Sequence, residues 1–199
     1  MKKVAIKLHI QILYHFLRLF YKKEYLVGMQ FPRDHMTQGW RSAFRYFINQ
    51  KIKRINSHVP WMCDPTTRIT DPENIDFDID YIDNFFNIGC YYQSMGHISI
   101  GKGTQIAQNV GIITSNHDFY DLNKHITPSP VSIGANCWIG MNSVILPGVV
   151  LGDRTIVGAG SIVTKSFPEG HCVICGNPAR EIKRIDSKNS NLDNEAIMR

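Results

Sequence analysis

A six-residue periodicity between residues 133 and 168 constrains the fold of this chain more than any other feature. The segment divides into IGANCW, IGMNSV, ILPGVV, LGDRTI, VGAGSI and VTKSFP, and every hexapeptide begins with Ile, Leu or Val. These residue types make up roughly a quarter of the chain, so six of them in one fixed phase is about a one-in-several-thousand event for a random start. The first positions are Ile133, Ile139, Ile145, Leu151, Val157 and Val163.

A hexapeptide repeat predicts one short strand and one turn in each repeat, and three strands complete a triangular coil of about 18 residues. Stacked coils join through parallel sheets whose neighbouring strands lie about 4.8 Å apart. Upstream of residue 133 the repeats are rougher, and their phase predicts an irregularity near residue 82. The predicted fold class is therefore mainly β: a parallel β-helix of about five coils over residues 68–185.

The repeat loses its phase between Ile112 and Ile133, because 21 residues are not a multiple of six. We therefore expect a loop that leaves the β-helix over residues 114–130. His117 stands at the start of this loop, in the sequence TSNHDFYDL. Asp118 follows it directly, and the sequence leaves open whether Asp118 orients the imidazole or caps the loop.

Residues 1–67 are predicted to form a helical extension, with helices over about 4–23 and 40–56. The first helix carries Lys, His, Gln and Arg among its apolar residues, which makes it too polar for a membrane span of about 20 apolar residues. No small-residue cleavage site follows, so a signal peptide is not expected. The helix is predicted to pack against the rest of the protein or, alternatively, to make a peripheral contact with a membrane surface. The polar segment 186–199 is expected to be a disordered tail or a short helix.

Charge and cysteine content narrow the partners and the compartment. The formal charge of +5 suits an anionic ligand such as a phosphorylated cofactor, and no nucleic-acid-binding motif is present. Five cysteines at irregular spacing do not predict a disulfide framework, which favours a cytoplasmic protein, with a position at the inner face of the membrane left open. Cys172 and Cys175 form a lone C-x-x-C, which we interpret as packing residues, and no metal is expected.

The segment IGANCWIGMNSVILPGVVLGDRTIVGAGSIVTKSFPEGHCVICGNPAREI closely resembles the hexapeptide-repeat acyltransferases. Within that family it is most similar to the maltose and galactoside O-acetyltransferases and to the capsule or O-antigen polysaccharide O-acetyltransferases. The resemblance covers residues 68–185 and is strongest over 106–185. It implies a left-handed β-helix, a homotrimer with active sites at the subunit interfaces, and acetyl-CoA as cosubstrate.

The resemblance also assigns roles to particular residues. His117 matches the catalytic base, which would remove a proton from the acceptor hydroxyl during attack on the thioester. Asn87, in DNFFNIG, matches an acceptor-binding Asn, with a structural turn as the alternative. The acidic acceptor contact of the family aligns with Met95 or Ser94, so the maltose or galactoside specificity does not transfer.

For the cofactor, the resemblance implies a groove between neighbouring subunits. Trp138, Met141, Ala159 and Thr164 would lie along this groove. The basic residues Lys165, Arg180 and Lys183 match positions near the cofactor phosphates. A backbone N–H near Met141 or Gly140 is a candidate oxyanion donor.

Three functions remain open from the sequence. The favoured one is acetyl transfer from acetyl-CoA to a hydroxyl of a sugar or glycan precursor. The second is N-acetylation of an amino sugar or of a xenobiotic antibiotic. The third is a β-helix of another class, such as a zinc carbonic anhydrase, which needs three histidines around one metal. Before residue 170, the repeat region offers only His97, His117 and His125 for that purpose.

Overall fold

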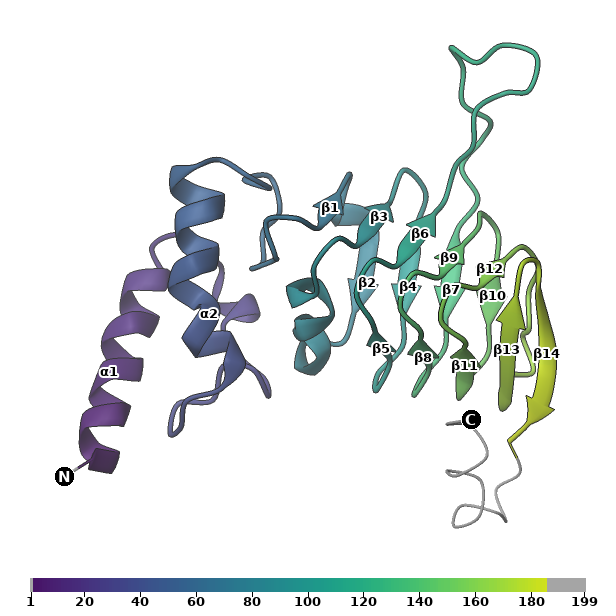
Figure 1. The fold of residues 1–199 in the computed structure, drawn as a ribbon. Coiled ribbons are helices and arrows are strands. Elements are labelled where there is room, and N and C mark those ends of the chain that lie inside the picture. Colours follow the sequence, from purple (N-terminus) through teal and green to yellow (C-terminus); the bar gives the residue numbers. More distant parts are fainter. Residues whose placement is uncertain (1, 186–199) are drawn as a thin grey trace.

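The computed structural model describes residues 2–185, with helices at one end of the molecule and stacked β-strands at the other (Figure 1). The tail predicted for residues 186–199 lies outside the described residues. The fold is mainly β with parallel sheets, as the six-residue period predicts. The strands form three sheets, which we call the first, second and third in the order in which the chain meets them.

Each sheet collects every third strand of the repeat, so successive strands pass from one sheet to the next. Only the last pair, β13 and β14, is antiparallel. The first sheet holds β1 (Arg68–Ile69), β3 (Tyr91–Gln93), β6 (Gly111–Ile113), β9 (Val144–Ile145) and β12 (Ile162–Val163). The second holds β2 (Ile75–Phe77), β4 (Ile98–Ile100), β7 (Val131–Ile133) and β10 (Val150–Leu151). The third holds β5 (Gln105–Ile106), β8 (Trp138–Ile139), β11 (Thr155–Val157), β13 (Cys172–Gly176) and β14 (Ala179–Arg184).

The aliphatic first position of each hexapeptide points into the β-helix. All six predicted residues from Ile133 to Val163 are buried. In the third sheet, Ile139 pairs in register with Ile106 on one side and with Val157 on the other, so identical positions stack from coil to coil. Each buried aliphatic side chain contributes roughly 1.5–3 kcal/mol to folding, which explains why the phase is kept so strictly.

The irregularity predicted near residue 82 is confirmed. A 3-10 segment, η4 (Ile79–Phe86), stands where the third sheet would otherwise have another strand, beside β5. The side chain of Asn84 takes over the missing ladder: its Nδ2 donates to the Thr104 carbonyl at 2.9 Å, and its Oδ1 accepts from the Ile106 N–H at 2.8 Å. One amide side chain thus replaces the donor and acceptor of a strand backbone.

The helical extension consists of α1 (Lys2–Leu17), η1 (Lys23–Tyr25), α2 (Gln38–Phe47) and the π-helical turn η2 (Ile48–Ile52). The prediction that the first helix reaches residue 23 was wrong. After Leu17 the amides of Leu19 and Phe20 bond to carbonyls three residues earlier, at 3.1 and 2.9 Å, which tightens and ends the helix. Ile10, Leu17 and Tyr21 are buried, so the predicted packing role of this helix is confirmed.

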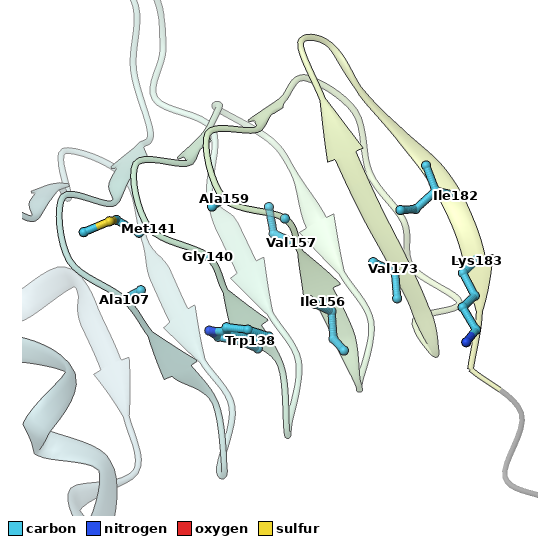
Figure 2. A pocket seen from close by; sticks show the side chains of 11 residues that line it. Ala107, Trp138, Gly140, Met141, Ile156, Val157, Ala159, Val173, Ile182 and Lys183 are labelled. Carbon is cyan, nitrogen blue, oxygen red and sulfur yellow. The ribbon is translucent and has the colours of Figure 1, made fainter. Parts of the chain in front are cut away.

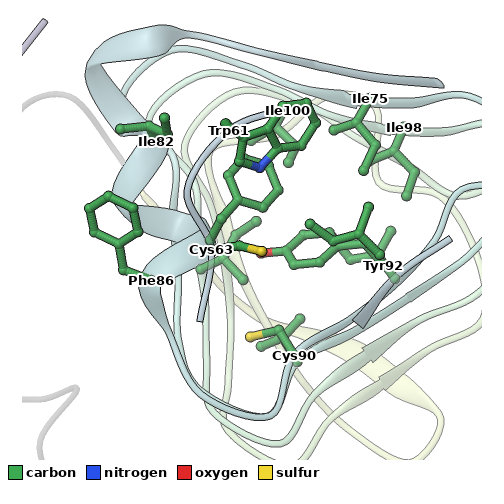
Figure 3. Packing of buried hydrophobic residues seen from close by; sticks show 14 of the residues in the cluster. Trp61, Cys63, Ile75, Ile82, Phe86, Cys90, Tyr92, Ile98 and Ile100 are labelled. Atoms are coloured by element: carbon green, nitrogen blue, oxygen red, sulfur yellow. The ribbon is translucent and has the colours of Figure 1, made fainter. Parts of the chain in front are cut away.

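Aromatic side chains fill the interior of the β-helix where it meets the extension (Figure 3). The Trp61 ring lies 4.9 Å from the rings of both Phe77 and Phe85, and Phe85 lies 5.1 Å from Tyr92.

A further short turn, η3 (Pro72–Asn74), joins β1 to β2. Within residues 2–185, no helix is long and apolar enough to cross a membrane.

Candidate functional site

A groove of about 560 Å³ runs along the outer face of the third sheet (Figure 2). It continues onto the corner where the chain turns from the third sheet to the first. Its walls are mostly apolar, with backbone at the corner and one lysine at the far end. The lining residues are Ala107, Trp138, Gly140, Met141, Ile156, Val157, Gly158, Ala159, Val173, Ile182 and Lys183. A long, mainly apolar channel of this shape fits an extended ligand with a charged end.

Corner residues of successive coils stack directly on one another along this groove. The Asn142 N–H donates to the Gln108 carbonyl at 3.2 Å, and the Gly160 N–H donates to the Met141 carbonyl at 2.8 Å. Asn142 and Gly160 both have a positive φ, of 59° and 70°, which these two residue types tolerate in tight turns. The groove therefore advances by one corner for every coil.

We call this stack of corner residues along the groove the corner column. Asn87 lies at its start, one coil before Ala107. Its Nδ2 donates to the carbonyl of Ile106 at 2.6 Å, and the next residue, Ile88, accepts from the Asn109 N–H at 3.0 Å. The hydrogen bond of the Asn87 side chain fits the alternative that Asn87 is a structural turn residue. The predicted acceptor contact would fall to the amide oxygen of the same side chain.

Four of the seven predicted cofactor residues line the groove: Trp138, Met141, Ala159 and Lys183. Arg180 is exposed on β14, and its Nη1 donates to the Ala179 carbonyl at 3.3 Å.

Thr164 and Lys165 are exposed and follow β12, at the corner between the first and second sheets. The Lys165 ammonium lies 5.5 Å from the centre of the Phe167 ring. One chain alone therefore does not bring these two residues to the groove.

The segment between β6 and β7 projects away from the sheets (Figure 1). Buried polar groups hold its base. Thr114 and Ser115 are buried, and Gln93 Oε1 accepts from their backbone N–H groups at 3.2 and 2.9 Å. The Ser129 N–H donates to the Thr114 carbonyl at 2.7 Å and closes the base from the other side. Gln93 could not be identified from the sequence, since a single Gln on a strand carries no motif.

Two histidines face each other on this loop. The rings of His117 and His125 lie 4.3 Å apart at an angle of 33°, and their backbones form an antiparallel bridge. His117 Nδ1 lies 2.8 Å from the Leu122 carbonyl. A carbonyl can only accept, so Nδ1 carries the proton and Nε2 of the neutral ring keeps a free lone pair.

Asp118 caps the loop. Its Oδ1 accepts from the backbone N–H groups of Tyr120 and Asp121 at 2.7 and 3.1 Å. The hydrogen bonds recorded for this carboxylate thus go to loop backbone, which supports the capping alternative over a role in orienting His117.

The loop and the groove lie at different corners of the triangle. The loop leaves after β6, at the corner between the first and second sheets, whereas the groove follows the corner between the third and first. Of the two candidate oxyanion donors, the Gly140 N–H is already used, since it donates to the Val157 carbonyl at 2.9 Å. None of the backbone hydrogen bonds recorded between the described residues starts from the Met141 N–H.

Cys172, Cys175 and His97 do not line the groove, and they lie outside the loop that carries His117. Cys172 is buried, and burial raises the pKa of its thiol, while Cys175 is partly buried; both are free thiols. His97 Nε2 lies 3.2 Å from Asp76 Oδ2 on the second sheet, apart from the two loop histidines. Over residues 2–185, no group of three or more His, Cys, Asp or Glu side chains is arranged to hold a metal ion.

Comparison with known proteins supports the interpretation of the repeat. The family described as bacterial transferase hexapeptide (six repeats) matches residues 130–165. A Staphylococcus aureus (strain Mu50) protein, provisionally named an acetyltransferase, is 36% identical over 136 residues, which cover 62% of this chain and 68% of that protein. The galactoside O-acetyltransferase of Escherichia coli K12 is 40% identical over 94 residues, or 46% of each chain.

A solved structure of a galactoside acetyltransferase in complex with coenzyme A superposes with a TM-score of 0.55 and is 32% identical. The match covers 63% of this chain and 62% of that one. The chain belongs to the hexapeptide-repeat acetyltransferases. The predicted enzyme class is thereby confirmed, and acetyl-CoA is the cosubstrate expected of an acetyltransferase in this family.

Proposed function

We propose that this protein transfers an acetyl group from acetyl-CoA to a hydroxyl of a sugar or glycan precursor, with His117 as general base. The observation that carries the proposal is the hydrogen bond from His117 Nδ1 to the Leu122 carbonyl. It fixes the tautomer whose Nε2 can accept a proton, on a loop that leaves the β-helix. The His125 ring packs against the His117 ring from one side, with the two rings tilted by 33°.

The reaction needs no acyl-enzyme intermediate. The acceptor oxygen attacks the thioester carbonyl, and its proton passes to His117 Nε2. The oxyanion of the tetrahedral intermediate accepts a hydrogen bond, for which the Met141 N–H is the available donor at the groove corner. Collapse of the intermediate breaks the C–S bond, and the imidazolium returns its proton to the leaving thiolate, which yields CoA and the acetyl ester.

A homotrimer would complete the site. The His117 loop and the groove lie at different corners of one chain, so a neighbouring subunit that brings its loop corner to this groove would join them. The same arrangement would bring Thr164 and Lys165 of the neighbour to the cofactor path, next to Lys183 and Arg180 of this chain. The cations would then face the cofactor phosphates. The left-handed sense and the count of about five coils belong to this proposal.

The acceptor end of the groove would lie at Asn87, at the N-terminal end of the corner column. A sugar hydroxyl is the favoured acceptor, since 40% identity to a galactoside O-acetyltransferase extends over 94 residues. An amine acceptor would use the same base, so N-acetylation is the alternative.

A screen with acetyl-CoA and matched hydroxyl and amine acceptors, read by release of free thiol, tests the proposal. We expect turnover with a saccharide hydroxyl, and His117→Ala should lower kcat by about two to four orders of magnitude. His97→Ala serves as the matched control, because His97 pairs with Asp76 outside the loop.

Activity that survives His117→Ala would remove the base from the mechanism, and turnover confined to amines would replace the O-acetyl assignment. Light scattering should give the mass of a trimer, and a monomer with full activity would contradict the shared site.

A further inference from the structure

Helix α1 has a second apolar face, which is exposed. Ile10 and Leu17 are buried on the inner face. On the outer face Leu8 and Ile12, four residues apart, are 61% and 63% exposed. We call this surface the α1 stripe; it consists of Val4, Leu8 and Ile12 on the helix, together with Leu19 in the turn that follows it. A surface helix of a soluble protein normally places polar residues there, so the α1 stripe is an apolar surface without a partner among residues 2–185.

The exposed apolar surface continues onto α2. The Phe47 ring lies 5.0 Å from Phe16 and 4.8 Å from Phe20, and Phe44 packs beside it at 6.3 Å. Phe16, Phe20 and Phe44 are all exposed in part. Helix α1 is the outermost element at its end of the molecule, opposite the β13–β14 hairpin (Figure 1).

The charge of the chain is concentrated at the same end. Residues 1–60 contain 12 of the 22 Lys and Arg residues but only two of the 17 Asp and Glu residues, whereas residues 61–199 contain 10 and 15. Residues 1–60 therefore carry a formal charge of +10, and residues 61–199 carry −5. No acidic residue lies between residues 1 and 23, and Lys22 and Lys23 are exposed just beyond α1.

We propose that the α1 stripe docks on an anionic lipid surface. Large aliphatic side chains on one face of a helix, with cations beside them, fit the boundary between acyl chains and headgroups. Lys and Arg near such a surface add electrostatic attraction that falls off within a Debye length. A second copy of the chain fits the α1 stripe less well, because it would bring two ends of charge +10 together. The proposal is independent of the acetyl-transfer chemistry.

Sedimentation with lipid vesicles tests the proposal on the full chain. We expect binding to vesicles of phosphatidylcholine mixed with phosphatidylglycerol, little binding to phosphatidylcholine alone, and release at high salt. The double substitution Leu8→Gln and Ile12→Gln should lower the partition coefficient at least tenfold, because two aliphatic side chains no longer enter the bilayer. Lys22→Gln with Lys23→Gln should lower it by roughly fivefold for each charge removed.

Matched controls lie on the β-helix, far from α1. Lys102→Gln with Arg154→Gln removes two exposed cations, and Val150→Gln removes an exposed apolar side chain. These controls should bind as the wild-type protein does. Circular dichroism establishes that each variant is folded before binding is compared.

Three results would overturn the proposal. One is equal binding to both vesicle types, and another is full binding by the folded Leu8→Gln and Ile12→Gln variant. The third is an absence of vesicle binding, which light scattering would interpret further: a change of mass in the same variant would make the α1 stripe a contact between copies of the chain.

Discussion

Replacement of Gln93 by Met should loosen the base of the loop that carries His117, while the groove stays unchanged. Gln93 Oε1 accepts from the N–H groups of Thr114 and Ser115, which are both buried, and Met preserves the length of the side chain but offers no comparable acceptor. A buried N–H left unpaired costs about 1–3 kcal/mol, so two of them cost about 2–6 kcal/mol. A loss near 3 kcal/mol corresponds to a fall in Tm of about 6–12 °C for a chain of this length.

The same substitution should act on turnover through the position of His117. We expect kcat to fall about tenfold, because a general base must stay within hydrogen-bond reach of its proton. The KM for acetyl-CoA should stay constant, since Gln93 does not line the groove. Thiol release gives the kinetic constants, and circular dichroism gives the melting curve.

Gln93→Glu is the matched variant, because its carboxylate still accepts both N–H bonds. It should recover most of the melting temperature and of kcat. The reasoning would be refuted if Gln93→Met melted and turned over like the wild-type protein, or if the Glu variant were as impaired as the Met variant.

Three further predictions concern the groove, a corner and a buried thiol. Trp138→Ala should raise the KM for acetyl-CoA about tenfold, measured by thiol release, because one apolar wall is lost. Gly140→Ala should lower the free energy of unfolding by about 1–3 kcal/mol in denaturant titrations, since its Cβ would lie 2.6 Å from the Ala159 nitrogen and the Val157 oxygen. Burial raises the pKa of Cys63 from 9.0 to about 12, so the thiol ionises more readily in the unfolded chain and the free energy of unfolding should fall as pH rises from 9 towards 12. Cys63→Ala should flatten this dependence when unfolding is compared at about pH 8 and about pH 11, and an unchanged slope would contradict it.

The parts of the fold that depend on a repeating constraint could be predicted from the sequence. Every coil must fill the same interior, so Ile139 and Val157 had to recur in phase, and the loss of phase after Ile112 marked the loop. The substitution of η4 for a strand left only an irregularity in the sequence. The bonds of the Asn84 side chain to the neighbouring coil could not be foreseen, because they depend on three-dimensional placement.

Most residues of the candidate site could be chosen from the sequence, but the corner of the β-helix at which each one lies is not evident from the repeat phase alone. The repeat phase indicates which residues point inward, but the corner that each turn occupies follows only when strands are counted in threes. That count puts Ile112 and Val163 on one sheet, and it would have grouped Thr164 and Lys165 with the loop rather than with Met141 and Ala159. The role of Gln93 depends on two hydrogen bonds to the loop backbone, and that of the Gly140 N–H on one bond to Val157. Residue types alone do not reveal either.

Because the corner residues repeat once in every coil, the length of the groove increases by a fixed amount with each coil. Ala107, Gly140 and Gly158 are separated by one coil each, so every coil adds about 4.8 Å to the distance between Asn87 and the β13–β14 hairpin. The hairpin is antiparallel and stops the third sheet at a fixed count. An inserted coil of 18 residues between β9 and β13 would lengthen the groove by one strand spacing and leave the contacts within each existing coil unchanged. We therefore expect the number of repeats, rather than any one side chain, to set the length of the donor that fits the groove.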